Sequence, residues 1–292
     1  MTGKTQPDFS PRARKVENLS RCPLCDGEYP ATPPVQPEPP FGLLQCAKCG
    51  VIFLSPRPPI EEMKHYYDEF YEGSHEKSAR QEKRSQRHFR RLTRYSPRPG
   101  RVLEVGAGDG YFLNAAKKAG WEVEGLELSQ PRIENAKKWF GVPLQCCDLL
   151  SASFKEGSFD AITMFQLIEH VHDPKALLTR ANKLLRPGGI MMLSTPNVLA
   201  YARKDRDVNS WRIPRHLFFF TPRTLVRTTE GLGFEVLRRP LKLFATLEER
   251  LGWQPWPTSA GFAKITRDLW TPFGLHMTAR KNREIAISNS VE

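Results

Sequence analysis

The sequence has no long hydrophobic run. None of its apolar stretches reaches the roughly 18 residues that a membrane-spanning helix requires, so we expect no transmembrane segment. Residues 1–20 are polar and lack the apolar core of a secretory signal. These two absences predict a cytoplasmic protein that works in a reducing environment.

Two nucleotide-binding signatures are also missing. The chain contains no G-K-[ST] sequence to hold a phosphate chain. In the glycine-rich segment 106–110, the third glycine comes one residue too early for a dinucleotide fingerprint, and Tyr111 occupies the fingerprint position. A ligand that carries a pyrophosphate is therefore disfavoured.

The segments around those glycines still predict a ligand pocket. Residues 102–105 form a short apolar run that is typical of a buried parallel strand, and a helical pattern begins at Tyr111. A strand, a glycine turn and a helix in that order form a pocket at the carboxyl edge of a parallel sheet. Glycine there lets the backbone approach a ligand closely and adopt a positive φ.

Length and charge set the outer limits of the interpretation. The chain has 292 residues, 39% of them hydrophobic, which is enough for one medium-sized catalytic domain and a small appendage. Its net charge is +12, much of it between residues 77 and 101. We favour a solvated basic helix that covers the pocket. A docking face for an anionic substrate, lipid surface or nucleic acid is the alternative.

Four of the six cysteines form two C-x-x-C pairs, Cys22 with Cys25 and Cys46 with Cys49. Four thiolates at these spacings suit a tetrahedral Zn²⁺ ion, and a closed shell of four sulfurs predicts a structural metal. Two disulfides are the first alternative, which a reducing setting disfavours. A redox C-x-x-C is the second, but it would not need a matched partner pair. Cys146 and Cys147 are predicted to pack inside a core strand.

Further strands are predicted at 121–127, 144–148, 159–165, 190–194, 234–237 and 276–281. Glu127 ends the first of these, where a carboxylate can accept hydrogen bonds from both hydroxyls of a ribose. It could equally stabilise the start of the next helix. Asp148 could accept from an adenine amino group, or it could simply form a turn.

Three motifs together resemble the class I S-adenosylmethionine (AdoMet) methyltransferases. They are the glycine turn 106–110, the segment Leu167-Ile168-Glu169-His170-Val171 with Asp173-Pro174, and the turn Leu185-Arg186-Pro187-Gly188-Gly189. The resemblance covers about residues 20–282. It is nearest to the branch of the ubiquinone-biosynthesis O-methyltransferases and the sugar and natural-product methyltransferases, several of which carry an N-terminal four-cysteine zinc ribbon.

The resemblance implies an α/β fold, with a doubly wound, Rossmann-like sheet of seven strands behind the zinc ribbon. It implies a tail at 1–20, a ribbon at 21–56, covering helices at 57–100, an AdoMet-binding domain at 101–282 with a helical insertion at 243–271, and a tail at 283–292. Both tails are expected to be disordered.

The resemblance also assigns the cofactor contacts. Glu104, Gly106, Gly108 and Gly110 would hold the methionine part of AdoMet, Glu127 the ribose, and Asp148 with Leu149 the adenine. Ala107 and Leu128 would also line the cofactor. Gln166 and His170 would lie near the sulfonium.

Methyl transfer needs alignment of the two reactants and a proton acceptor. Histidine suits the second task, and His170 and His216 are the candidates by resemblance. A packing role beside the cofactor is the alternative for His170, and a core or capping role is the alternative for His216. Arg215 stands where some carbon-methylating relatives have an acid, which fits an anionic acceptor such as a sugar nucleotide.

The expected function is AdoMet-dependent methylation of an oxygen or carbon atom of a small molecule, such as a sugar nucleotide, a natural product or a quinone-type compound. An rRNA base methyltransferase with a zinc ribbon is one alternative. Against it, Gln166-Leu167-Ile168-Glu169 replaces the [N/D]-P-P-[Y/F] turn that family members use on base amines. A non-catalytic adaptor built on a methyltransferase scaffold is the other. The sequence does not predict an oligomeric state.

Overall fold

The computed structural model describes residues 15–28, 37, 39–63, 76–198, 211–238 and 274–282. The predicted helical insertion at 243–271, the tail at 283–292 and residues 1–14 lie outside this part of the chain. Residues 15–20 of the predicted N-terminal tail lie inside it, and there Glu17 forms an antiparallel bridge with Arg57. No helix within the described ranges is both long and apolar enough to cross a bilayer.

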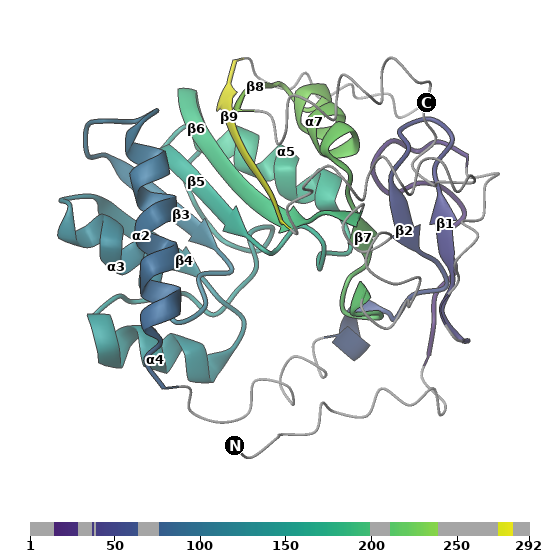
Figure 1. The fold of residues 1–292 in the computed structure, drawn as a ribbon, viewed down its shortest axis with the longest axis horizontal. Helices are drawn as coiled ribbons and strands as arrows, with labels where there is room; N and C mark the ends of the chain where they lie inside the picture. The colour runs from purple at the N-terminus through teal and green to yellow at the C-terminus, as the bar shows by residue number, and fades with distance from the viewer. Residues whose placement is uncertain are drawn as a thin grey trace, which may run out of the picture.

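A six-stranded sheet forms the centre of the molecule, in the order β4-β3-β5-β6-β9-β8 (Figure 1). Its strands are β3 (Arg101–Val105), β4 (Glu122–Leu126), β5 (Phe159–Phe165), β6 (Leu185–Pro196), β8 (Phe234–Arg238) and β9 (Gly274–Lys281). The first four run parallel, and β9 is antiparallel to both of its neighbours. This confirms the predicted α/β class.

The strand predicted at 144–148 is reduced to one parallel bridge between Leu126 and Gln145. Gln145 makes both main-chain bonds of that bridge, to Gly125 and from Glu127. Pro143 has no N–H with which to extend the ladder, and Cys147 turns back to the carbonyl of Gln145. The prediction that Cys146 and Cys147 are buried is wrong, because Cys146 is exposed and Cys147 is half-buried.

The sheet carries a different apolar layer on each face, because neighbouring strand residues point to opposite sides. Leu103 and Val105 of β3 join one cluster, and Val102 joins the other. The second cluster includes the inner sides of α2 (Ala79–Thr93) and α3 (Tyr111–Lys118). The first includes residues of α5 (Pro174–Leu184) and α7 (Pro222–Gly231). Helix α4 (Gln130–Phe140) lies at the β4 side (Figure 1).

A second, three-stranded sheet contains the cysteine segment. Strands β1 (Leu43–Gln45) and β2 (Ile52–Leu54) are antiparallel, and β2 pairs on its other side with β7 (Phe218–Phe219). The buried apolar residues of β1 and β2 belong to the same cluster as Leu103 and Val105 of β3. The cysteine segment and the central sheet therefore share one continuous hydrophobic core.

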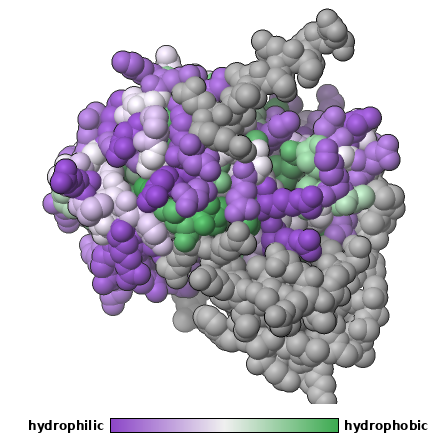
Figure 2. Space-filling view, turned by 90° about the horizontal axis from the view of Figure 1, so that it is seen from above, coloured by the Kyte–Doolittle hydropathy of each residue, from purple (hydrophilic) through white to green (hydrophobic). Residues whose placement is uncertain are grey.

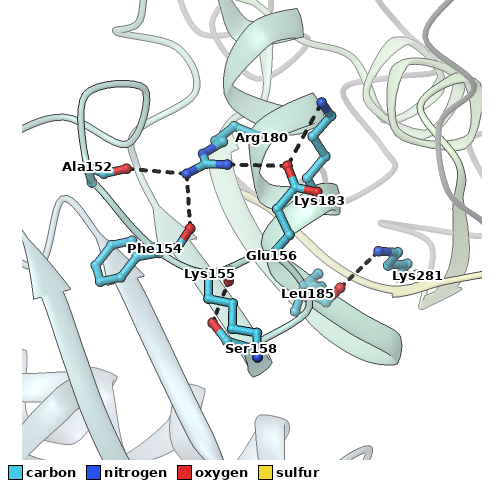
Figure 3. A network of polar contacts seen from close by, with 9 residues as sticks. All are labelled: Ala152, Phe154, Lys155, Glu156, Ser158, Arg180, Lys183, Leu185 and Lys281. Atoms are coloured by element: carbon cyan, nitrogen blue, oxygen red, sulfur yellow. Dashed lines mark hydrogen bonds and ion pairs between the residues drawn. The ribbon is translucent and has the colours of Figure 1, made fainter.

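Polar groups at helix starts and between elements fix the loops. Asp173 caps α5 by accepting from the N–H of Ala176, and Thr221 caps α7 by accepting from that of Thr224. In Figure 3, Arg180 of α5 donates to the carbonyls of Ala152 and Phe154 and thereby holds the loop before β5 against that helix.

The view of Figure 2 shows how the described surface is divided. Hydrophilic residues cover most of the coloured surface in this view, and a hydrophobic area lies near its middle.

We expect Gly110→Ala to destabilise the protein more than Gly188→Ala. Both glycines have a positive φ, 78° at Gly110 and 75° at Gly188, which costs an alanine about 1–2 kcal/mol. A Cβ at Gly110 would also lie 2.9 Å from the Cβ of Ala136 on α4, whereas one at Gly188 meets nothing within 4 Å. The contact should add about 1–3 kcal/mol. Urea unfolding measures both free energies, and equal losses would contradict a tight α3–α4 contact.

Candidate functional site

The glycine turn follows β3 in the chain and is hydrogen-bonded to the carboxyl end of β4. Gly106, Gly108 and Gly110 have φ angles of 70°, 56° and 78°, which favour glycine. The N–H groups of Gly106 and Ala107 both donate to the carbonyl of Leu126 at 2.9 Å. A Cβ at Gly106 would approach Leu167 to 3.1 Å. The absence of side chains therefore lets the turn run close to the loop that follows β5.

Glu127 follows β4 directly and faces this turn. Its Oε2 accepts from the N–H of Gly108 at 2.8 Å, and its Oε1 accepts from the N–H groups of Leu128 and Ser129 at 2.9 and 3.0 Å. The carboxylate thus bridges the glycine turn and the start of α4. An ionised carboxylate has about four acceptor positions, so it retains capacity for hydroxyl donors from a ligand.

Glu104 lies on β3, two residues before the glycine turn, and only 4% of its surface is exposed. Its Oε2 has no hydrogen-bond partner within the described part of the chain. Burial and the charge of Glu127 raise the pKa of Glu104 well above its ordinary value, while the guanidinium of Arg84 opposes that rise. Because an unpaired buried carboxyl is costly, this atom marks a place where a cationic donor would be stabilised.

Asp148 and Leu149 follow the single bridge made by Gln145. Oδ1 of Asp148 accepts from the N–H groups of Leu150 and Ser151, both at 2.8 Å, and from the Ser151 hydroxyl at 3.0 Å. Asp148 therefore forms the turn that was its alternative role. Leu149 is buried, with 1% of its surface exposed.

Gln166 ends β5 in a conformation that the sequence did not predict. Its φ is 56°, in the left-handed region that non-glycine residues rarely adopt. Its N–H donates to the carbonyl of Ser194 at 2.8 Å, and its Nε2 donates to the Ser194 hydroxyl at 3.3 Å. Such backbone strain costs about 1–3 kcal/mol and is concentrated at functional sites. It turns the chain sharply at the carboxyl edge.

His170 and His216 meet at this edge although they are distant in sequence. Their ring centroids are 4.8 Å apart, in an edge-to-face arrangement. The His170 side chain is 23% exposed, whereas His216 is 2% exposed. His170 Nδ1 lies 2.8 Å from the carbonyl oxygen of Arg215. Since a carbonyl only accepts, Nδ1 carries the proton and Nε2 carries the lone pair.

Glu169 is the residue of this group to which the sequence analysis gave no role. It is 1% exposed, and its Oε1 lies 3.9 Å from Nε2 of His170. Burial raises the pKa of Glu169 to about 8, against the opposing effects of the Thr195 hydroxyl and Arg212. An acid beside a histidine, directly after a buried strand, was the available signal.

Burial also lowers the pKa of both histidines, to about 4 for His170 and about 2 for His216. At neutral pH all three side chains are therefore uncharged. The group can accept a proton at His170 Nε2, but it presents no fixed charge.

The four predicted metal-ligating cysteines come together. Sγ of Cys25 lies 3.4 Å from that of Cys46, and Sγ of Cys22 lies 3.7 Å from that of Cys49. All four sulfurs lie within 4.8 Å of one another, and none is in a disulfide. A tetrahedral zinc with Zn–S bonds of about 2.3 Å requires S···S distances of about 3.8 Å. The cluster thus fits a zinc ion.

One other group in the described residues has potential metal-ligating atoms this close together, namely Glu169, His170 and His216. The pKa values of both histidines are also lowered by the guanidinium groups of Arg212 and Arg215. Positive charge nearby disfavours a cation, so we assign no metal to this group.

Comparisons with known proteins place the chain in context. The model of a family described as "Methyltransferase domain" matches residues 79–239, more than half of the chain. A ubiquinone biosynthesis O-methyltransferase of Idiomarina loihiensis is 29% identical over 51% of this chain and 70% of its own length. An enzyme of the same name from Xanthomonas axonopodis pv. citri is 35% identical over 36% of this chain and 46% of its own length.

A solved structure shows the same fold. A SAM-dependent methyltransferase from Archaeoglobus fulgidus has a TM-score of 0.50 at 20% identity, and the match covers 74% of this chain and 99% of that one.

The buried carboxyl of Glu169 predicts a stability that falls as the pH rises from about 5 to 8. The folded state keeps its proton up to about pH 8, whereas the ordinary pKa is 4.5. The folded state thus binds more protons than the unfolded one between these values. Stability contributed by this group therefore falls as the pH rises from about 5 to 8, by up to about 1.4 kcal/mol per pH unit, and levels off above pH 8, where both states are ionised. Over pH 5–8, Glu169→Gln should flatten the decline measured by urea unfolding, and parallel curves would contradict a buried neutral acid.

Proposed function

This chain belongs to the class I AdoMet-dependent methyltransferase family, and on that premise we propose that it methylates an oxygen or carbon atom of a small-molecule acceptor. The observation that carries the proposal is the pair of carboxyl groups at the glycine turn. Glu104 offers an unpartnered buried oxygen, and Glu127 offers a carboxylate fixed by three main-chain N–H groups. AdoMet has the matching donors, an α-ammonium group and two ribose hydroxyls.

The proposed cofactor contacts follow from this pair. Glu104 accepts from the ammonium group, and the charge of that group compensates the burial of the carboxylate. The backbone of Gly106, Ala107, Gly108 and Gly110 lies along the methionine part. Glu127, beside Leu128, accepts from the ribose. Leu149 packs against the adenine, and Asp148 retains its second oxygen for the adenine amino group. AdoMet supplies an electrophilic methyl group on a sulfonium; the protein supplies alignment.

On the acceptor side we propose that His170, next to Gln166, accepts the proton of the acceptor. Its Nδ1–H donates to the carbonyl of Arg215. The proton is therefore on Nδ1, and the unprotonated Nε2 can accept the proton of the acceptor. Its pKa of about 4 keeps it neutral throughout the physiological range. His216 packs edge-to-face against the His170 ring and supports it. We retain His216 as the second candidate for the proton acceptor.

The acceptor class rests on two lines of support. The curated relatives are named as ubiquinone biosynthesis O-methyltransferases, which favours a quinone-type phenolic oxygen. Arg212 and Arg215 lie near enough to lower the pKa of His170, so they would also attract an anionic acceptor such as a sugar nucleotide. We further propose a structural Zn²⁺ at Cys22, Cys25, Cys46 and Cys49, in a ribbon that spans 21–56 before a catalytic domain at 101–282.

Calorimetry with AdoMet and S-adenosylhomocysteine tests the cofactor site. We expect the wild-type protein to bind both, and Glu127→Gln to weaken binding about 10- to 100-fold, because a hydrogen bond to a charged group is worth about 1.5–3 kcal/mol. Glu124→Gln is the matched control, since Glu124 lies on β4, the strand that Glu127 follows, but pairs with Arg101. Equal affinities in the two variants would show that Glu127 does not bind the cofactor. If the wild type bound neither compound, the proposed function would be wrong.

His170→Asn tests the acceptor side. The asparagine amide can still donate to the carbonyl of Arg215 but has no ring nitrogen to accept a proton. We expect kcat for transfer to a catechol acceptor to fall about 10²- to 10⁴-fold, with AdoMet affinity unchanged. A loss of less than threefold at saturating acceptor would show that His170 only packs beside the cofactor.

A further inference from the structure

A single segment of backbone connects the cysteine ribbon to the histidines. Strand β7 follows His216 after one residue, and it is also the third strand of the ribbon sheet. Phe53 of β2 lies opposite Phe218, and Ile52 lies opposite Phe219. The N–H of Leu54 donates to the carbonyl of Leu217 at 2.9 Å. The ribbon edge therefore fixes the register of the segment that carries His216.

The same segment is bonded on its other side to the loop that follows β5. The N–H groups of Leu217 and Phe218 both donate to the carbonyl of Glu169, at 2.7 and 3.2 Å. The backbone at 217–218 thus lies between strand β2 and the Glu169–His170 loop. A displacement of β2 would be transmitted to His170 through two shared hydrogen bonds, and this residue also bonds to Arg215.

Arg57 forms a second connection from the ribbon to the same loop. Only 7% of it is exposed, and its Nε pairs with the Glu17 carboxylate at 2.6 Å. Its Nη1 donates to the carbonyl of His172 at 3.0 Å. In return, Nε2 of His172 donates to the carbonyl of Pro58 at 2.9 Å. The residues after β2 therefore clamp the loop two positions beyond His170.

The second cysteine pair lies in the turn between β1 and β2, and main-chain hydrogen bonds close that turn. The N–H of Cys46 donates to the carbonyl of Val51, and the N–H of Gly50 donates to that of Cys46. A Cβ at Gly50, whose φ is 79°, would contact Thr224 at the start of α7. The turn that carries Cys46 and Cys49 is thus packed directly against the start of α7. A change in its geometry would reach both β2 and α7.

We propose that the metal-bound ribbon positions the acceptor side of the active site, and that Arg57 is a positioning residue for His170. The metal cluster holds the β1–β2 turn, β2 holds the segment 217–219, and that segment with Arg57 holds the 169–172 loop. The cofactor side is separate, because the glycine turn and Glu127 are held by bonds to β4 and α4. The role of His170 and the presence of the metal in this inference rest on the proposed function.

Amide hydrogen exchange on the zinc-loaded and the chelated full-length protein tests the metal's part. After zinc loss, verified by metal analysis, peptides that cover 211–220 and 166–173 should exchange at least about tenfold faster. Peptides from β3 and β4 should keep their protection, and calorimetry should show an AdoMet affinity within about twofold of that of the loaded protein. Unchanged protection at 211–220 without metal would overturn the proposal, as would an equal loss across the central sheet.

A pair of variants makes the same test without chelator. Cys49→Ser removes one sulfur, and we expect it to reproduce the exchange pattern of the chelated protein. Lys48→Ala is the matched control, since Lys48 is an exposed residue of the same turn that ligates nothing. Faster exchange at 211–220 in both variants would attribute the effect to the turn sequence and not to the metal, and would refute the inference.

Arg57→Gln and Arg57→Lys test the second connection while all four cysteines are intact. We expect Arg57→Gln to retain zinc and bind AdoMet normally, yet to speed exchange at 166–173 and lower kcat without raising the KM for AdoMet. Arg57→Lys keeps one donor nitrogen, so it should show both effects to a smaller extent. Wild-type exchange in Arg57→Gln would overturn the assignment. These exchange results stand even if AdoMet does not bind, so failure of the proposed function would be recognised separately.

Discussion

Two carboxyl groups are buried at the carboxyl edge of the sheet, and the rest of the site depends on their desolvation. Glu104 lies on β3, Glu169 follows β5, and neither is more than 4% exposed. Leaving such groups without full hydrogen bonding costs several kcal/mol. Folding tolerates this cost because the large cores on both faces of the sheet exclude water from the same edge. Burial raises the pKa of both carboxyl groups, and Glu169 stays protonated beside a neutral histidine.

The elements that the sequence predicted well are those whose signal is local. Strand β5 begins and ends at the predicted residues, because a mostly apolar run, interrupted only by Asp160 and Thr163, lies between polar residues. The segment at 144–148 makes a single bridge, since Pro143 and the turn at Cys147 remove the donors that a ladder needs. Strand β7 has only two residues, and a periodicity cannot be read from so short a segment.

The candidate site was predictable in residue type but not in environment. The glycine turn, Glu127 and the cysteine pairs were identified from spacing, because backbone conformation and metal geometry impose that spacing. The burial of His216 could not be identified in this way, since it results from pairing between β2 and β7, which are far apart in the chain. The role of Glu169 was missed for the same reason. Its pKa is raised chiefly by burial, which depends on tertiary packing and not on local sequence.

The neutrality of His170 is consistent with the proposed reaction. Methyl transfer discharges the sulfonium, and the positive charge leaves with the acceptor's proton, which His170 Nε2 takes up in that reaction. A protonated histidine at this place would repel the sulfonium and could accept no proton. Burial prevents both effects by lowering the pKa of His170 to about 4. Strand β2 of the ribbon pairs with β7, and the N–H groups of Leu217 and Phe218 donate to the carbonyl of Glu169, so the ribbon is hydrogen-bonded through one strand to the loop that carries His170.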